Sequence, residues 1–255
     1  MATVTKAACL ALAVIALSIR TSPSRADADL IKVYSPIVEK GVLELETRGH
    51  GSVARPSSND DVQAHRGEIG YGITDWWHTS LFGEFQQFKG EGLTYNATGF
   101  ENIFQLTPQG KYFADFGLYL EYRRSAFSSR PDEVETKLLI EKAVSPVVLT
   151  ANLVFEKEIG RNADTGIDFA YTAVAKIPVT NALSLGVQAL GEPGRLSSFP
   201  TFQRQEHSIG PVVSGSFHLG NIPGKIEYEF GYLFGITSAS ARGTPKYIVE
   251  YEMPF

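Results

Sequence analysis

The chain has 255 residues, of which 11% are aromatic and 20% are charged, and its 28 acidic residues outnumber its 23 basic residues. This apolar content excludes a disordered chain, and an acidic chain without basic clusters argues against nucleic-acid binding. Since no run of about 18 apolar residues is present, a helical membrane protein is excluded as well.

The first residues have the pattern of a secretory signal peptide. Lys6 precedes an apolar run over 7–17, and small residues at Ser24 and Ala26 close a polar stretch. This order of charge, apolar run and small residues is typical of exported proteins. We expect residues 1–26 to be removed, with cleavage after Ala28 as the second choice.

Cleavage after Ala26 changes the charge and the chemistry of the mature chain. It removes three basic residues and no acidic one, so the net charge falls from −5 to −8. The single cysteine, Cys9, lies inside the predicted signal. We therefore expect no disulfide, no thiol chemistry and no cofactor in the mature protein.

After a short segment at 27–40, which we expect on the periplasmic side, an alternating pattern continues to the end. In 42–48, Leu43 and Leu45 alternate with Glu44 and Glu46. Period 2 is the side-chain period of a β-strand. Twelve such segments are predicted, over about 42–48, 62–73, 80–86, 95–106, 112–124, 133–144, 147–159, 167–178, 183–191, 205–219, 225–237 and 245–255.

The connections between these segments alternate in length. Short turns around 74–75, 107–110, 145–146, 179–181 and 221–224 alternate with mostly longer polar connections. An even strand count with short turns on the side of the termini is typical of transmembrane barrels. The sequence therefore predicts an all-β fold, an antiparallel up-and-down transmembrane β-barrel over 41–255. A β-sandwich with a similar period is the alternative.

The closing stretch alternates most clearly. One face carries Tyr247, Val249, Tyr251, Met253 and Phe255. This stretch resembles the C-terminal strand of Gram-negative outer-membrane β-barrels. The resemblance implies an outer-membrane location and recognition of this strand by the barrel-assembly machinery.

A second, shorter match lies at 71–76, Tyr-Gly-Ile-Thr-Asp-Trp. It resembles strand-turn segments of several small outer-membrane transporter families, among them families associated with phenol-degradation operons. The motif is too short to transfer a function to this chain.

If the apolar face meets lipid, the opposite face lines the lumen, and that face is mostly acidic. The predicted pore-lining residues are Glu44, Glu46, Arg48, Arg66, Glu68, Glu84, Asp115, Glu121, Arg123, Glu135, Lys137, Glu156, Glu158, Asp168, Lys176, Glu227 and Glu229. Burying so many carboxylates without water is costly, which favours a hydrated, cation-favouring channel or small-solute transporter. The alternative is a scaffold or adhesion barrel whose charges pair and plug the lumen. A plug domain is not expected, because only about 14 residues precede the first strand.

An outer-membrane lipid hydrolase is the enzyme alternative. The nearest match to such a phospholipase site is Glu206-His-Ser-Ile-Gly210, but adjacent residues of a strand point to opposite faces. His50 and His65, with Asp60 and Asp61, are of residue types that bind metals and lie near the mouth. Because surface histidines near loops are common, we predict no metal site. The loop 192–204 carries Phe199 and Phe202 and is a candidate constriction.

Overall fold

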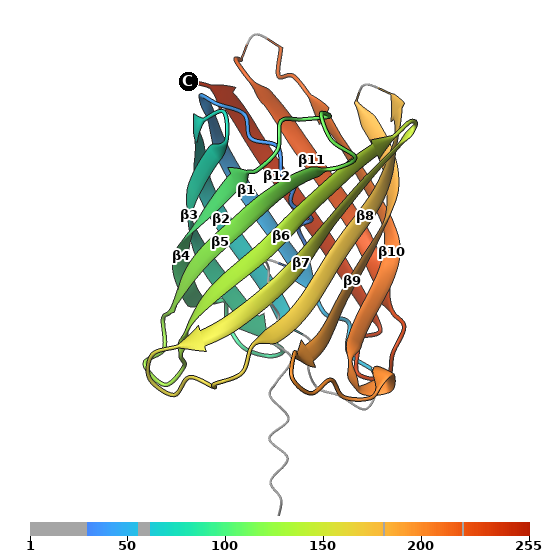
Figure 1. Cartoon of the computed structure of the whole chain (residues 1–255). Helices are drawn as coiled ribbons and strands as arrows, with labels where there is room; N and C mark the ends of the chain where they lie inside the picture. Colours follow the sequence, from blue (N-terminus) through green and yellow to red (C-terminus); the bar gives the residue numbers. More distant parts are fainter. Residues whose placement is uncertain (1–29, 56–61, 181, 221) are drawn as a thin grey trace, which may run out of the picture.

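The computed structural model describes residues 30–55, 62–180, 182–220 and 222–255. Twelve antiparallel strands form a closed barrel (Figure 1) in which each strand pairs with its neighbours in sequence and β12 pairs with β1. The predicted fold class is confirmed. Within the described residues, no helix is long and apolar enough to cross a membrane.

The strands are β1 (Val42–Gly51), β2 (Val62–Thr74), β3 (Trp77–Phe88), β4 (Thr94–Gln105), β5 (Asp115–Ser125), β6 (Asp132–Val144), β7 (Val147–Ile159), β8 (Asp168–Thr180), β9 (Leu183–Arg195), β10 (Glu206–Phe217), β11 (Lys225–Gly235) and β12 (Gly243–Pro254). A single turn of 3-10 helix, η1 (Phe202–Arg204), lies between β9 and β10. All twelve predicted segments are strands, and most of their limits agree within three residues.

The largest difference in strand limits is at β9, which continues to Arg195 and not only to about 191. The sequence placed the start of a loop at 192, just before Pro193 and Gly194. Both lie in the strand because the register with β8 shifts locally, between Phe169 and Tyr171, and leaves the proline without a required ladder bond.

At the end of the barrel where the C-terminus lies, only some of the turns are short. Two residues join β2 to β3, β6 to β7 and β8 to β9. The connections 106–114 and 218–224 at the same end are longer than predicted. The asymmetry between the two ends of the barrel is therefore weaker than the sequence suggested.

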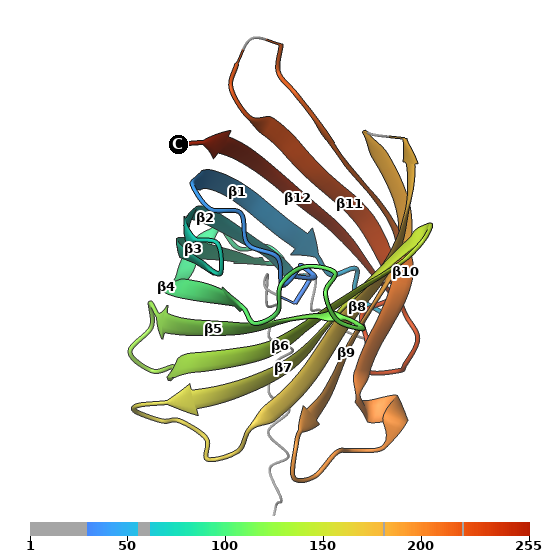
Figure 2. The ribbon, with the colours of Figure 1, turned by 45° about the horizontal axis from the view of Figure 1, so that its top comes forward.

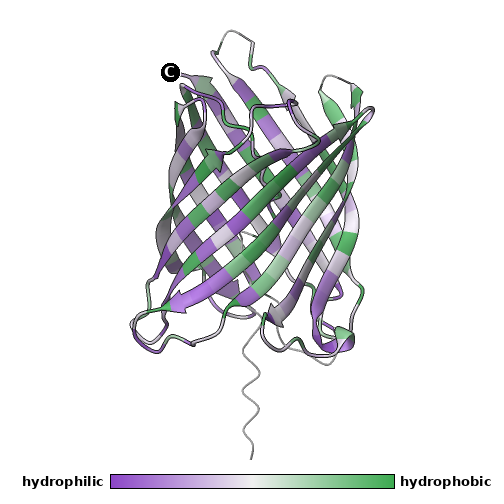
Figure 3. Ribbon diagram, in the orientation of Figure 1, coloured by the Kyte–Doolittle hydropathy of each residue, from purple (hydrophilic) through white to green (hydrophobic). Residues whose placement is uncertain are grey.

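Alternation places apolar side chains outside and charged side chains inside. On the first three strands, Leu45, Ile69 and Leu81 are exposed, whereas Glu46, Arg66 and Glu84 are buried. In Figure 3, apolar and polar positions alternate along many strands. The barrel thus encloses polar side chains and exposes apolar ones. An apolar outer surface of this kind is typical of barrels that contact lipid and not water.

The closing strand β12 joins the ends of the barrel. It pairs with β1 from Val42↔Pro254 to His50↔Lys246 and also with β11. The N–H of Phe255 donates to the carbonyl of Gly41 at 2.7 Å, and the ring of Phe255 is 83% exposed. The outward face of β12 thus ends on an unburied aromatic ring.

Several predictions fall on residues outside the described part of the chain. These are the signal peptide with Cys9, both cleavage positions, the aspartates Asp60 and Asp61, and the turn residues Asn181 and Asn221.

The part of the predicted periplasmic segment that the structure describes, 30–40, lies inside the barrel. Figure 2 shows this segment, in blue ahead of β1, within the ring of strands. Leu30, Ile31 and Tyr34 are at most 4% exposed. The segment is stabilised inside the lumen because its apolar side chains are buried there. The wall of the barrel also supplies hydrogen-bond partners to its backbone.

Candidate functional site

The lumen holds the charged residues that the sequence placed on the inner face. Of the seventeen, nine are buried: Glu46, Arg48, Arg66, Glu84, Asp115, Glu121, Glu135, Lys137 and Glu229. The others are partly buried: Glu44, Glu68, Arg123, Glu156, Glu158, Asp168, Lys176 and Glu227. The sequence missed buried Glu101 and Glu133, although both lie on inward-facing positions of their strands.

Arg66 organises one group of carboxylates. Its guanidinium lies 2.7 Å from Glu84, 2.8 Å from Glu121 and 3.4 Å from Glu101. Its charged carbon also lies 3.7 Å from the centre of the Phe82 ring. One fully buried cation thus faces carboxylates from three strands, β3, β4 and β5.

Arg48 organises a second group beside the first. It contacts Glu46 on its own strand and Glu68 on β2, the latter at 3.2 Å. Its Nη2 donates to the hydroxyl of Tyr34 at 2.7 Å. This group therefore connects the wall of the barrel to the segment inside it.

A third group lies around Glu229 of β11, in register with Arg48 across β12. Lys246 reaches one oxygen of this carboxylate at 2.5 Å, and Lys176 reaches the other at 2.6 Å. The ammonium of Lys246 also donates to the carbonyl of Ile31 at 2.6 Å. This second link to the inner segment lies far along the chain from Arg48.

Charges inside the barrel do not balance. Among the described residues, nine acidic side chains are buried but only four basic ones: Glu46, Glu84, Glu101, Asp115, Glu121, Glu133, Glu135, Glu229 and Glu252 against Arg48, Arg66, Lys137 and Lys246. Networks of ion pairs exist, but the excess of carboxylates gives the lumen a negative potential.

Asp168 lies at the rim of the barrel. Its side chain is 48% exposed and lies 3.4 Å from Arg195, which also pairs with Asp164 at 2.8 Å. The hydrogen bond from Arg195, followed by one from the backbone of Gly166, lowers the pKa of Asp164 to about 2. Asp164 therefore remains ionised at neutral pH.

We name residues 30–41 the inner segment. Asn152 of β7 binds its backbone twice: the N–H of Tyr34 donates to Oδ1, and Nδ2 donates to the carbonyl of Tyr34, both at 2.8 Å. Gln188 donates to the carbonyl of Ile31 at 3.0 Å, and Gln105 accepts from the N–H of Val38 at 3.0 Å. Side-chain amides of the barrel wall thus bind the backbone of the inner segment, which pairs with no strand there.

The ring of Tyr34 is the most enclosed part of the inner segment. It lies 4.8 Å from the ring of Tyr119, and the ammonium of Lys137 lies 4.4 Å from the centre of each ring. Its hydroxyl donates to Glu101 at 3.1 Å. Cation–π contacts and a charge-assisted hydrogen bond fix the ring in the middle of the lumen.

The two ends of the inner segment also contact the wall. Leu30 packs against Val154 and Ala170, while Lys32 pairs with Glu46 at 2.5 Å. Nearer β1, a Cβ atom on Gly117 would lie 2.8 Å from the Cβ of Pro36. The segment therefore crosses the lumen in contact with strands from opposite sides of the barrel.

The hydrolase pattern at Glu206–Gly210 has no nucleophile–base pair. Nδ1 of His207 lies 3.0 Å from the hydroxyl of Tyr171, and Nε2 lies 2.8 Å from Oε1 of Gln205. Both nitrogens are engaged by groups other than Ser208. These contacts agree with strand alternation, which placed His207 and Ser208 on opposite faces.

The two histidines at the first loop do not converge on one point. His65 is in register with Gly49 and bonds Tyr247, whereas His50 is in register with Ala64. Neighbouring positions of paired strands face opposite sides. Among the described residues, no group of three metal-binding side chains is present.

The phenylalanines of the 192–204 loop pack on the outside of the barrel. Phe199 lies 6.1 Å from Phe169, and Phe202 stacks on His207 at 4.9 Å between ring centres. Phe169 belongs to the outward row of β8. The expectation that this loop forms a constriction over the mouth is therefore wrong for these two residues, because their rings contact outward-facing side chains.

Neither the protein-family models nor the curated proteins include a match to this chain. Solved structures do resemble it. The NanC porin aligns with a TM-score of 0.55 at 10% identity, over 83% of this chain and 100% of that chain. An outer membrane channel from Pseudomonas putida F1 aligns with 0.52 at 10% identity, over 86% and 97%.

The KdgM porin aligns with a TM-score of 0.50 at 12% identity, over 83% of this chain and 99% of that chain. At such low identities, likeness establishes the fold and leaves the solute open. The resemblance to outer-membrane β-barrels that the closing strand suggested is thus confirmed as a likeness of fold.

Proposed function

We propose that this chain is a narrow channel for small solutes in the outer membrane, that it favours cations, and that the inner segment limits its conduction. The observation that carries the proposal is the excess of buried carboxylates inside a closed barrel, nine against four buried basic residues among those described. Water in the lumen lowers the cost of so much negative charge, and a negative lumen favours cations.

The outward apolar surface supports the membrane location. Leu81, Phe100 and Phe230 are each at least 45% exposed on different strands. Such a surface suits lipid, since a closed barrel leaves no backbone group unpaired. The N-terminal pattern of a signal peptide supports export, and the porins and the channel of similar fold support a conducting barrel.

The inner segment is the natural constriction. Residues 30–41 form no strand, and wall side chains such as Asn152, Gln188 and Lys246 hold them. These contacts break without opening the barrel, because none of them belongs to the ladder between strands. The segment can therefore leave the lumen while the wall remains intact.

Planar-bilayer recording of the purified mature chain tests this function. We expect discrete conductance steps and, under a KCl gradient, a reversal potential of the sign that K⁺ preference produces. The preference should weaken between about 0.1 M and 1 M salt, as the screening length falls from about 10 Å to about 3 Å. Recordings that match a lipid-only control would refute the channel.

A scaffold with a plugged lumen is the second candidate. The ion pairs of Arg66, Arg48 and Lys246, together with the inner segment, favour it. The two functions differ in one result: the scaffold predicts no conductance even when the inner segment is removed.

A further inference from the structure

The wall of the barrel binds the backbone of the inner segment at Tyr34 through a carboxamide. Oδ1 of Asn152 accepts from the N–H of Tyr34, and Nδ2 donates to the carbonyl of the same residue, both at 2.8 Å. Each residue of a peptide offers one donor and one acceptor, and a carboxamide presents an acceptor and a donor side by side. This contact therefore recognises a peptide backbone, whatever side chain the residue carries.

The carbonyl of Ile31, three residues earlier, is a second point of backbone binding. It accepts from Nε2 of Gln188 at 3.0 Å and from the ammonium of Lys246 at 2.6 Å. Lys246 also donates to Oε1 of Gln188 at 2.5 Å, and Nε2 of Gln188 donates to the hydroxyl of Thr172 at 3.3 Å. The wall itself thus orients the Gln188 amide, which lowers the entropy cost of binding a backbone.

The groups that bind the backbone are buried in the lumen. Asn152 on β7 and Gln188 on β9 are each 0% exposed, and Lys246 on β12 is 4% exposed. A buried polar group that loses its partner carries the full cost of its desolvation. In the proposed open state, in which the inner segment has left the lumen, these groups become available to a second backbone with the same spacing.

The ring of Tyr34 indicates one side chain that the site fits. It lies 4.8 Å from the ring of Tyr119, with the ammonium of Lys137 4.4 Å from the centre of each ring. Its hydroxyl donates to Glu101 at 3.1 Å and accepts from Nη2 of Arg48 at 2.7 Å. A tyrosine satisfies both groups, whereas a phenylalanine leaves a buried carboxylate and a buried cation with one hydrogen bond fewer.

The side chain of Lys32, two positions before the tyrosine, indicates a second requirement. Its ammonium lies 2.5 Å from Glu46 on β1 and 3.6 Å from Glu250 on β12. A basic residue at this position of a ligand would meet the same two carboxylates. The excess of buried carboxylates in the lumen also favours a cationic ligand.

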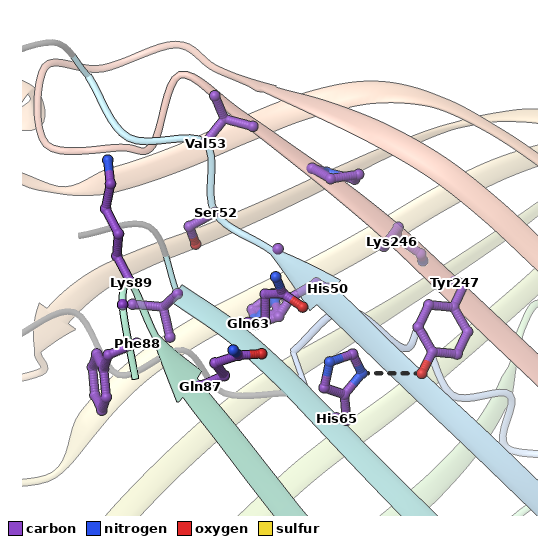
Figure 4. A pocket seen from close by; sticks show the side chains of 14 residues that line it. His50, Ser52, Val53, Gln63, His65, Gln87, Phe88, Lys89, Lys246 and Tyr247 are labelled. Carbon is purple, nitrogen blue, oxygen red and sulfur yellow. Dashed lines mark hydrogen bonds between the residues drawn. The ribbon is translucent and has the colours of Figure 1, made fainter. Parts of the chain in front are cut away.

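A cavity of about 710 Å³ lies at the end of the barrel where β12 begins (Figure 4). Lys246 lines this cavity, and the same residue binds the carbonyl of Ile31. His50, in register with Lys246 across β1 and β12, lines it as well. Lys246 thus joins the cavity to one end of the backbone site.

We propose that the lumen contains a peptide-binding site, that the inner segment occupies it as an internal competitor, and that its external ligand is a short peptide with a basic residue two positions before a tyrosine. Asn152, Gln188 and Lys246 bind the ligand backbone, while Glu46 and Glu101 select its side chains. The proposal rests on the proposed function in one respect, that the inner segment can leave the lumen, and it does not require conduction.

A capped hexapeptide with the sequence of residues 30–35, Leu-Ile-Lys-Val-Tyr-Ser, tests the site. Fluorescence anisotropy of the labelled peptide measures its binding to purified mature barrels in detergent. Gly117→Ala is one receptor, because its added Cβ displaces Pro36, which the hexapeptide does not contain. We expect Gly117→Ala to bind the peptide about 10-fold more tightly than the wild type, since the apparent affinity scales with the fraction of barrels whose site is empty. The chain without residues 30–40 is the second receptor and should bind at least as tightly as Gly117→Ala.

The same peptide methylated at the tyrosine nitrogen separates backbone recognition from side-chain recognition. The methyl group removes the N–H from which Asn152 accepts, so we expect about 10-fold weaker binding to Gly117→Ala. Adding Asn152→Leu to Gly117→Ala should abolish the difference between the two peptides. Adding Thr150→Val instead should preserve it, because Thr150 lies on the same face of β7 and bonds Glu141.

Equal binding of the methylated and unmethylated peptides would overturn the proposal, as would equal binding of a scrambled peptide of the same composition. Absence of binding to both Gly117→Ala and the chain without residues 30–40, each shown to be a closed barrel by its heat-dependent gel mobility, would overturn it as well. Conductance of the same preparations is a separate readout. Barrels that bind the peptide without conducting would refute the channel alone, and barrels that conduct without binding it would refute the peptide site alone.

Discussion

Arg66 is fully buried and contacts three carboxylates, so its removal leaves Glu84, Glu101 and Glu121 with one cation fewer. We expect Arg66→Met to lower the free energy of unfolding by about 3 kcal/mol, because breaking a buried ion-pair group is strongly destabilising. Urea unfolding in detergent, followed by the fluorescence of Trp76 and Trp77, measures this change.

Arg124 provides the matched control for Arg66. It lies on β5, the strand that carries Glu121, is exposed, and points away from the lumen. Arg124→Met should leave the unfolding midpoint within the error of the wild type. An equal loss in both variants would show that the lumen network contributes no more than a surface charge.

Asn152 holds the backbone of Tyr34 through two hydrogen bonds of 2.8 Å. Asn152→Leu keeps the volume but removes both bonds, which weakens docking of the inner segment by about 2 kcal/mol, or about 30-fold. We expect single-channel recordings to show a larger fraction of time at high conductance.

The control for Asn152 is Thr150→Val on the same face of β7. The hydroxyl of Thr150 bonds Glu141 and not the inner segment. A similar rise in open time for both variants would contradict the assigned role of Asn152, since it would reflect the strand and not the segment.

At the scale of elements, the closing strand β12 has a terminal aromatic residue with two separate contacts. The N–H of Phe255 bonds Gly41, and its ring lies edge-on to Tyr71 at 6.3 Å. Most of the ring is nevertheless exposed, in keeping with the proposal that the assembly machinery recognises this residue. Removing Phe255 should therefore lower outer-membrane levels more than it changes conduction per barrel.

Cell fractionation with quantitative blotting measures those levels, and bilayer recording measures conduction. Phe255→Tyr, which keeps an aromatic end, is the control. Normal surface levels of the chain without Phe255 would contradict a role of this residue in assembly.

The strands were predictable from the sequence because period-2 alternation is a local property. Leu45 outside and Glu46 inside follow from neighbouring positions alone, and the same holds for the carboxylates missed at 101 and 133. The limits failed at β9, where Pro193 and Gly194 are tolerated through a shift in register that depends on the partner strand.

The inner segment was not predicted to lie inside the barrel. Its twelve positions show no alternation, and its partners Asn152, Gln188 and Lys246 lie more than 100 residues away in sequence. The signals that could have identified it are the apolar Leu30, Ile31 and Tyr34 in a segment taken to be in water, and uncharged amides on inward positions of otherwise acidic strands.

At the scale of the whole molecule, the barrel combines a hydrogen-bonded wall with an inner segment that we propose can leave the lumen. Ladders between all neighbouring strands close the wall, while the inner segment is bound mainly through side chains. The negative lumen belongs to the wall. Selectivity for cations and the size of the conductance should therefore be separable properties, the first set by the wall and the second by the segment.

Gly117→Ala tests whether cation selectivity and the size of the conductance are separable, without shortening the chain. The new Cβ would lie 2.8 Å from that of Pro36, so the inner segment must shift. Gly67→Ala is the matched control, because nothing lies within 4 Å of the added atom. Gly117→Ala should raise conductance, and Gly67→Ala should not.

Single-channel recording of the mature chain with and without residues 30–40, under the same KCl gradient, tests whether the inner segment limits conduction. We expect a several-fold larger conductance without the segment and a reversal potential that still favours K⁺. Equal conductance in the two chains, with Gly117→Ala also unchanged, would contradict the claim that the inner segment limits conduction.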